Sequence, residues 1–273
     1  MKQTSTKLWR GVSIAAVLST LLMLTGFAYA VKDMLWPQAS SYSGDLSSTT
    51  TEEQGRLATS DTIRVTAIGD SLTKGTGDAT GEGYVKQVIA MLSDKLDKKV
   101  QLTNNLAING MRADRLAELL KGDKGYHYAL SQSDLILFTI GGNDLFQLAA
   151  GTNASSAAGV VDLAQLKERL ADGLKRFETV TQELAEINPD AKIVYVGLYN
   201  PFYDLQELRE GSLTIQQWNE QAYAMVHRYP NMMMVPTFDL FEATISDYLS
   251  SDHFHPNHEG YAQIAARIVQ ALH

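Results

Sequence analysis

The sequence predicts an α/β fold, a three-layer α/β/α sandwich in which a central, mainly parallel sheet of five strands lies between two layers of helices. Short β-branched and apolar segments alternate along the chain with longer segments whose apolar residues recur at helical spacing. Most of the short segments are apolar almost throughout, as strands are when helices cover both faces of a parallel sheet. Right-handed crossovers between such strands give the sandwich. The five predicted strands are Thr62–Ile68, Val100–Leu106, Leu135–Ile140, Lys192–Leu198 and Met232–Pro236.

The helices expected between these strands follow from apolar residues at helical spacing. Such spacing covers residues 84–96, 113–120, 163–187, 212–226 and 261–272. The longest of these helices ends where Asn188 precedes Pro189, because a proline cannot continue a helix. A glycine-rich loop at residues 73–83 lacks both nucleotide-binding glycine patterns, which argues against a nucleotide site. Residues 147–162, rich in Ala, Gly and Ser, are expected to form a surface loop rather than a mobile flap.

The first 60 residues are predicted to lie outside the folded domain. Lys2, Lys7 and Arg10 precede an apolar run at residues 11–30, as in a secretion signal or a membrane anchor. Ala30 ends a pattern of small residues typical of a cleavage site, but the run is also long enough to span a bilayer. Both interpretations stay open, an uncleaved anchor is favoured, and both place the rest of the chain outside the cytoplasm. The predicted regions are a signal or anchor at 1–37, a linker rich in Ser and Thr at 38–60 and one folded domain at 61–273.

The composition excludes several kinds of chemistry. The chain has no cysteine, which excludes disulfides, thiolate metal sites and a cysteine nucleophile. Its net charge is −8 at pH 7 and the domain has no basic run, so nucleic acid is not an expected partner. Because the chain has no cysteine, any nucleophile must be an oxygen or a nitrogen atom.

A serine and a histidine at opposite ends of the domain are the candidate reactive groups. Ser71 directly follows the first strand, at the edge where α/β proteins bind ligands. Asp252 stands three residues before His255 in the turn before the last helix, and a carboxylate that holds one ring nitrogen lets the other accept a proton from a serine. The alternatives are an ordinary turn at Ser71 and a histidine that only packs against the last helix. A metal site at Asp252, His253 and His255 would lack a further ligand.

Four separated segments together resemble the sequence blocks of the SGNH or GDSL family of lipases and esterases. The blocks are Gly69-Asp70-Ser71-Leu72, Asn109-Gly110, Gly142-Asn143-Asp144 and Asp252-His253-Phe254-His255-Pro256. The resemblance implies the flavodoxin-like SGNH fold, with no cofactor and no metal. It also implies that Ser71 is the nucleophile, His255 the general base and then acid, and Asp252 the residue that orients His255. The implied oxyanion hole is formed by the backbone N–H groups of Ser71 and Gly110 and the side-chain amide of Asn143, and such donors suit the negative oxygen of an acyl-transfer intermediate.

The predicted function is hydrolysis of carboxylic esters outside the cytoplasm, through a Ser-His-Asp triad and an acyl-enzyme. The chain resembles small extracytoplasmic bacterial acylhydrolases, among them lysophospholipases and thioesterases. A loop with Asn200, Pro201 and Phe202 follows the fourth strand and either lines the substrate pocket or only packs down. The expected partners are an ester substrate, either a lipid or an acylated small molecule or glycan, and a membrane contacted by the N-terminal segment. The alternatives are an acetylesterase or acyltransferase that acts on cell-wall glycans, and a wall-binding module without activity.

Overall fold

The computed structural model describes residues 3–35, 60–146 and 163–272. The chain divides into two units, residues 1–49 and 50–273. The first unit contains α1, a helix of 33 residues from Gln3 to Leu35. Among the helices described, none combines the length and the apolar character that a membrane span needs. Residues 38–59 of the predicted linker and the predicted surface loop at 147–162 lie outside the described residues.

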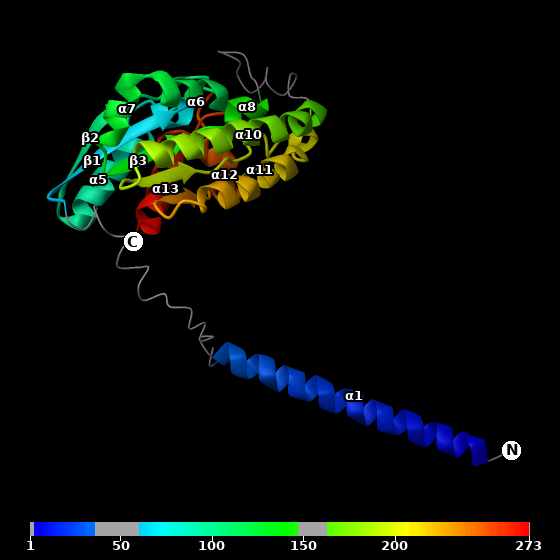
Figure 1. The fold of residues 1–273 in the computed structure, drawn as a ribbon. Helices are drawn as coiled ribbons and strands as arrows, with labels where there is room; N and C mark the ends of the chain where they lie inside the picture. Colours follow the sequence, from blue (N-terminus) through cyan, green and yellow to red (C-terminus); the bar gives the residue numbers. More distant parts are fainter. Residues whose placement is uncertain (1–2, 36–59, 147–162, 273) are drawn as a thin grey trace. The chain divides into compact units, whose positions relative to one another are not determined.

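The second unit is built on the predicted five-stranded sheet (Figure 1). Its strand order is β2-β1-β3-β4-β5, and every pair of neighbouring strands is parallel. In the edge strand β2, exposed residues alternate with buried or half-buried ones, whereas β3 is buried throughout, so burial on both faces belongs to the inner strands. The strands are β1 (Thr62–Gly69), β2 (Lys99–Asn105), β3 (Leu135–Thr139), β4 (Lys192–Val196) and β5 (Met232–Val235).

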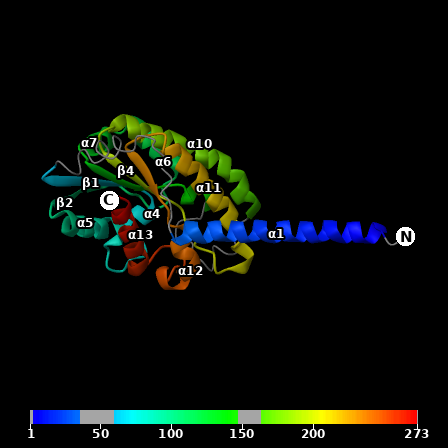
Figure 2. The same cartoon turned by 90° about the horizontal axis from the view of Figure 1, so that it is seen from below.

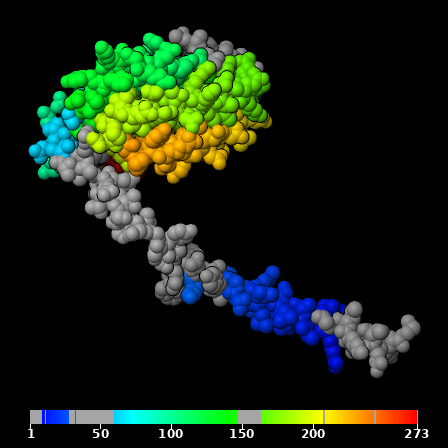
Figure 3. All heavy atoms as spheres, in the orientation of Figure 1, coloured from blue at the N-terminus to red at the C-terminus, as the bar shows by residue number. Residues whose placement is uncertain are grey.

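Helices cover both faces of this sheet, which confirms the predicted three-layer sandwich (Figures 1 and 2). One core lies between the sheet and four helices, α6 (Ala113–Gly122), α7 (Lys124–Ser131), α10 (Leu163–Ile187) and α11 (Gly211–Val226). The second core lies between the other face and α5 (Gly83–Leu96), α12 (Phe238–Tyr248) and α13 (His258–Ala271). In Figure 3, α10 in yellow-green forms much of the face turned to the viewer.

Five helical segments were not expected from the sequence. They are α7, α12, and the short segments α4 (Ser71–Lys74), α8 (Gly142–Phe146) and η1 (Gln206–Leu208). The short helices α4 and α8 each begin within three residues of the end of a strand, so they turn the chain at the carboxyl edge of the sheet. That edge carries the candidate site.

A buried tryptophan supports the turn that leads into α8. Trp218 is fully buried, and its Nε1 donates a hydrogen bond to the hydroxyl of Tyr195 at 2.9 Å. The Tyr195 hydroxyl in turn donates to the carbonyl of Ile140 at 3.0 Å. Gly141 has a φ of +111°, and a Cβ there would lie 2.2 Å from the indole ring. Only glycine therefore allows the chain to cross the indole and begin α8 at this place.

Candidate active site

Ser71 is held at the end of β1 by the two residues before it. Gly69 has a φ of +121°, and a Cβ at this position would lie 1.9 Å from the carbonyl oxygen of Thr139 on β3. Asp70 caps α4: its carboxylate accepts a hydrogen bond from the N–H of Leu72 at 3.1 Å and another from the hydroxyl of Thr139. Ser71 is then the first residue of α4, where backbone N–H groups have no partner within the helix.

Ser71, His255 and Asp252 form a continuous line of hydrogen bonds. The Oγ atom of Ser71 lies 2.8 Å from Nε2 of His255. On the other side of the ring, Nδ1 of His255 lies 2.7 Å from Oδ2 of Asp252. The structure thus brings together three residues that are up to 184 positions apart in the sequence. With Nδ1 as donor to the carboxylate, Nε2 is the acceptor that faces the serine hydroxyl.

The carboxylate of Asp252 is fixed by the loop in which it stands. Its Oδ1 accepts hydrogen bonds from the hydroxyl of Ser250 at 2.8 Å and from the N–H groups of Phe254 and His255, both at 2.9 Å. Burial of Asp252 opposes ionisation, but these donors and the His255 ring outweigh it and hold the pKa of the carboxyl well below its usual range. Asp252 is therefore a carboxylate at neutral pH. Sequence analysis did not assign Ser250, because a serine beside an aspartate is too common to stand out.

Two distant segments hold the histidine loop in place. Gly77, in the glycine-rich loop, has a φ of +96°, and a Cβ there would lie 2.8 Å from Cβ of His255 and 2.6 Å from the carbonyl oxygen of Pro256. The hydroxyl of Tyr199, after β4, donates to the carbonyl of Phe254 at 2.6 Å. The glycine-rich loop thus serves as close packing for the histidine loop.

Gly110 and Asn143 lie on two turns that are joined to each other at the sheet edge. The N–H of Ile108 donates to the carbonyl of Gly69 at 2.9 Å, which places the Gly110 turn beside Ser71. Gly110 itself has a φ of +76°. The side chain of Asn143 comes from α8, and its Nδ2 donates to the carbonyl of Met111 at 2.9 Å. One of the two amide hydrogens of Asn143 is thereby used, and the other is left for a further acceptor.

Asp144 adds a second link between the same two segments. Its Oδ2 accepts the N–H of Ala113 at 2.9 Å, so adjacent side chains of α8 hold residues 111 and 113 on either side of Arg112. Its Oδ1 is buried without a hydrogen-bond partner among the described residues, and Nη1 of Arg176 lies 3.6 Å away. Burial raises the pKa of Asp144 to about 6, against the opposing effect of the Ala113 N–H. Sequence analysis gave Asp144 no role, although a charged residue five positions after the end of a buried strand is a usable sign.

The loop after β4 mostly packs against the domain. Asn200 is buried, donates to the hydroxyl of Ser212 at 2.9 Å and accepts the N–H of Phe202 at 3.0 Å. The ring of Phe202 is buried edge-on against Phe146. Pro201 lines a small cavity of about 30 Å³ that also touches Asp70 and Leu72. Of the three predicted substrate-loop residues, Pro201 is the one that the structure places at a cavity next to Ser71.

No group of three or more histidine, aspartate or glutamate side chains within the described parts of the chain is arranged to hold a metal ion.

The comparisons with known proteins agree on one family. The sequence model of the GDSL-like lipase/acylhydrolase family matches residues 67–263. The uncharacterized protein YpmR of Bacillus subtilis (strain 168) is 38% identical over 218 residues, which cover 78% of this chain and 83% of that protein. The spore germination lipase LipC of Bacillus licheniformis is 24% identical over 212 residues, which cover 76% of this chain and 95% of LipC.

Solved structures show the same fold. The crystal structure of the lipase Lip_vut3 from a goat rumen metagenome superimposes with a TM-score of 0.65 at 23% identity, over 77% of this chain and 97% of that one. A parallel five-stranded sheet between two helical layers is the SGNH or GDSL hydrolase fold. The chain belongs to the GDSL-like lipase/acylhydrolase family and is a carboxylic ester hydrolase.

Proposed function

We propose that the protein hydrolyses carboxylic esters through an acyl-enzyme formed on Ser71. The observation that carries this proposal is the line of hydrogen bonds from Ser71 Oγ to His255 Nε2, at 2.8 Å, and from His255 Nδ1 to Asp252, at 2.7 Å. In the first step Oγ attacks the ester carbonyl carbon while its proton moves to Nε2 of His255. The resulting imidazolium is stabilised by the carboxylate of Asp252.

The same groups complete the first half of the reaction and then carry out the second. His255 returns the proton to the departing alkoxide, which leaves as the alcohol and gives the acyl-enzyme. Water then attacks the acyl carbon, gives its proton to His255, and the acid departs when Ser71 recovers that proton. In both halves the carbonyl oxygen becomes negative. We assign its stabilisation to the N–H groups of Ser71 and Gly110 and the free amide hydrogen of Asn143.

Labelling with a fluorophosphonate tests this proposal. The full-length protein should be modified at Ser71, whereas Ser71→Ala and His255→Ala should show neither labelling nor ester turnover above background. Ser131→Ala is the matched control, because Ser131 is an exposed serine on α7 whose hydroxyl bonds only the nearby carbonyl of Tyr128 and the side-chain amide of Gln132. Labelling at another residue, or normal turnover by Ser71→Ala, would refute the mechanism. A screen of lipid esters against acetylated glycans, with and without an added sugar acceptor, separates the lipase, acetylesterase and acyltransferase activities.

We further propose that the N-terminal segment places the domain outside the cytoplasm, as an anchor or as a cleaved signal. Support comes from the basic residues before the apolar run at 11–30 and from large apolar side chains on α1 that are mostly exposed, among them Leu22 at 74% and Met23 at 75%. Cell fractionation with N-terminal sequencing tests the proposal. A membrane-bound chain with an intact N-terminus indicates an anchor, a chain that begins at Val31 indicates a cleaved signal, and intact protein in the cytoplasm contradicts both.

A further inference from the structure

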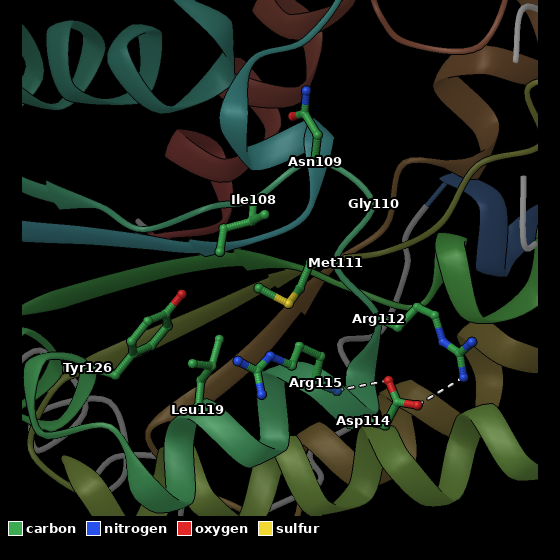
Figure 4. Close-up of a pocket in the computed structure, with 9 residues that line it drawn as sticks. All are labelled: Ile108, Asn109, Gly110, Met111, Arg112, Asp114, Arg115, Leu119 and Tyr126. Carbon is green, nitrogen blue, oxygen red and sulfur yellow. Dashed lines mark hydrogen bonds and ion pairs between the residues drawn. The ribbon is translucent and has the colours of Figure 1, made fainter. Parts of the chain in front are cut away.

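A cavity of about 400 Å³ begins at Gly110, one of the proposed oxyanion donors. This volume lies within the usual range of small-molecule sites. The cavity belongs to the turn between β2 and α6 and to the outer side of α6 and α7 (Figure 4). It is lined by Ile108, Asn109, Gly110, Met111, Arg112, Asp114, Arg115, Leu119 and Tyr126.

Part of the lining is apolar. The side chains of Ile108, Met111 and Leu119 and the ring of Tyr126 surround the space in Figure 4. Ile108 is 51% exposed although it is a large aliphatic residue, and the ring of Tyr126 is fixed because its hydroxyl donates to the carbonyl of Leu106 at 3.0 Å. An aliphatic chain placed in the cavity would remove this apolar surface from water, which is favourable.

Arg115 supplies positive charge to this space, whereas the guanidinium of Arg112 points away from Met111 and Leu119 toward Asp114 (Figure 4). The guanidinium of Arg115 lies between Met111 and Leu119 in Figure 4. Arg115 forms an ion pair with Glu118 at 2.7 Å, in which the two side chains are 63% and 67% exposed. Such exposed pairs are weak enough for Glu118 to be replaced by another anion. Arg112 pairs with Asp114 through Nη2 at 2.9 Å, but its Nε is buried without a hydrogen-bond partner among the described residues. Asp114 also lines the cavity, but its carboxylate is already paired with Arg112, so Arg115 is the charged side chain left for an anionic ligand.

We propose, resting on the function proposed above, that this cavity is a substrate subsite that selects an aliphatic chain bearing a carboxylate or phosphate group. Because Gly110 lines the cavity, an ester whose carbonyl oxygen accepts the N–H of Gly110 would lie beside it, with one of its two substituents along Met111 and Leu119. The anion of that substituent is bound by Arg115. Because the chain as a whole carries a net charge of −8, a preference for anionic esters has to come from Arg115 and not from the general field of the protein.

The anion can belong to the acyl half or to the alcohol half of the ester, and two matched substrate pairs distinguish these sources. 4-Nitrophenyl hexanoate and the mono-4-nitrophenyl ester of adipic acid differ by a carboxylate on the acyl chain. 1-Hexanoylglycerol and its 3-phosphate differ by a phosphate on the alcohol. In one of the two pairs the full-length protein should show a kcat/KM for the anionic member about tenfold above that of the neutral member, expressed mainly in KM.

Arginine variants then test the assignment. Arg115→Gln should reduce the ratio between the anionic and the neutral ester toward one, and Arg115→Glu should invert it. The matched control is Arg228→Gln, which removes one positive charge from an exposed pair with Glu178 elsewhere on the domain and should leave the ratio unchanged. Equal melting temperatures establish that the variants are folded.

The possible failures are distinguishable. A ratio below about twofold in both pairs, a ratio that survives Arg115→Gln, or labelling of Ser71 without hydrolysis of any of the four esters overturns the subsite while leaving the proposed function in place. Absence of both fluorophosphonate labelling and hydrolysis contradicts the proposed function itself, and the subsite with it.

Discussion

Replacement of Asn143 tests the oxyanion hole without touching the serine or the histidine. In the structure, one amide hydrogen of Asn143 is bound to the carbonyl of Met111 at 2.9 Å, so the other is held in a fixed direction. A donor fixed in this way helps the negatively charged transition state more than the neutral ester. Loss of one such donor costs about 10² to 10³ in kcat, or roughly 3 to 4 kcal/mol.

Asn143→Ala should therefore lower kcat by about two to three orders of magnitude with little change in KM. It should also lower the free energy of unfolding by about 1 kcal/mol, because the bond to Met111 is lost as well. Asn143→Asp should be at least as inactive, since its carboxylate faces both the carbonyl of Met111 and the developing negative charge. Steady-state kinetics on a soluble ester and urea denaturation measure the two effects. If Asn143→Asp retains wild-type kcat, the residue is structural and the oxyanion assignment is wrong.

Two further predictions concern glycine and aspartate positions that support the site. Gly77→Ala should displace His255 and lower kcat at least tenfold more than Gly81→Ala. Both glycines have positive φ, at +96° and +71°, but only the Cβ at position 77 would meet His255. Equal kcat values for the two variants would contradict the packing role. For Asp144, whose pKa is raised by burial from 3.8 to about 6, the folded protein keeps a proton that the unfolded chain loses above pH about 4. The free energy of unfolding of the wild type should therefore fall, relative to that of Asp144→Asn, by about 2 to 3 kcal/mol as the pH rises from about 4 to about 7. Urea denaturation at several pH values measures this difference. A difference independent of pH would refute the raised pKa of Asp144.

The sheet was predictable because each strand is a short apolar run between turn residues. Ile63 and Leu137 are buried by helices on a face of the sheet, and the sequence shows this burial directly as hydrophobicity. Helix α7 was not predicted, because it is only eight residues long and begins with Lys124-Gly125. Its start depends on the Asp123 side chain, which caps the first turn. Helix α12 has non-helical backbone at Thr244, which interrupts the spacing that predicts a helix.

Part of the candidate site could also be predicted from the sequence, and part could not. Ser71, Asp252 and His255 stand in short linear motifs, so their chemistry could be proposed before the fold was known. The bond from the Tyr199 hydroxyl to the carbonyl of Phe254 joins residues 55 positions apart, and the bond from Asp144 to Ala113 joins residues 31 positions apart. No local spacing predicts such bonds, because they depend on how neighbouring strands bring their loops together.

The turn that supplies Gly110 also supplies the first residues of the 400 Å³ cavity, so the proposed oxyanion hole and the proposed subsite share one segment of backbone. That segment is fixed by two side chains of α8, with Asn143 on the carbonyl of Met111 and Asp144 on the N–H of Ala113. A ligand that lies along Met111, whose carbonyl is one of these anchors, acts on the same backbone that positions the N–H of Gly110. Binding in the cavity and stabilisation of the oxyanion are therefore expected to be coupled. Substrate preference in this protein should then appear in kcat as well as in KM when the anchors on α8 are weakened.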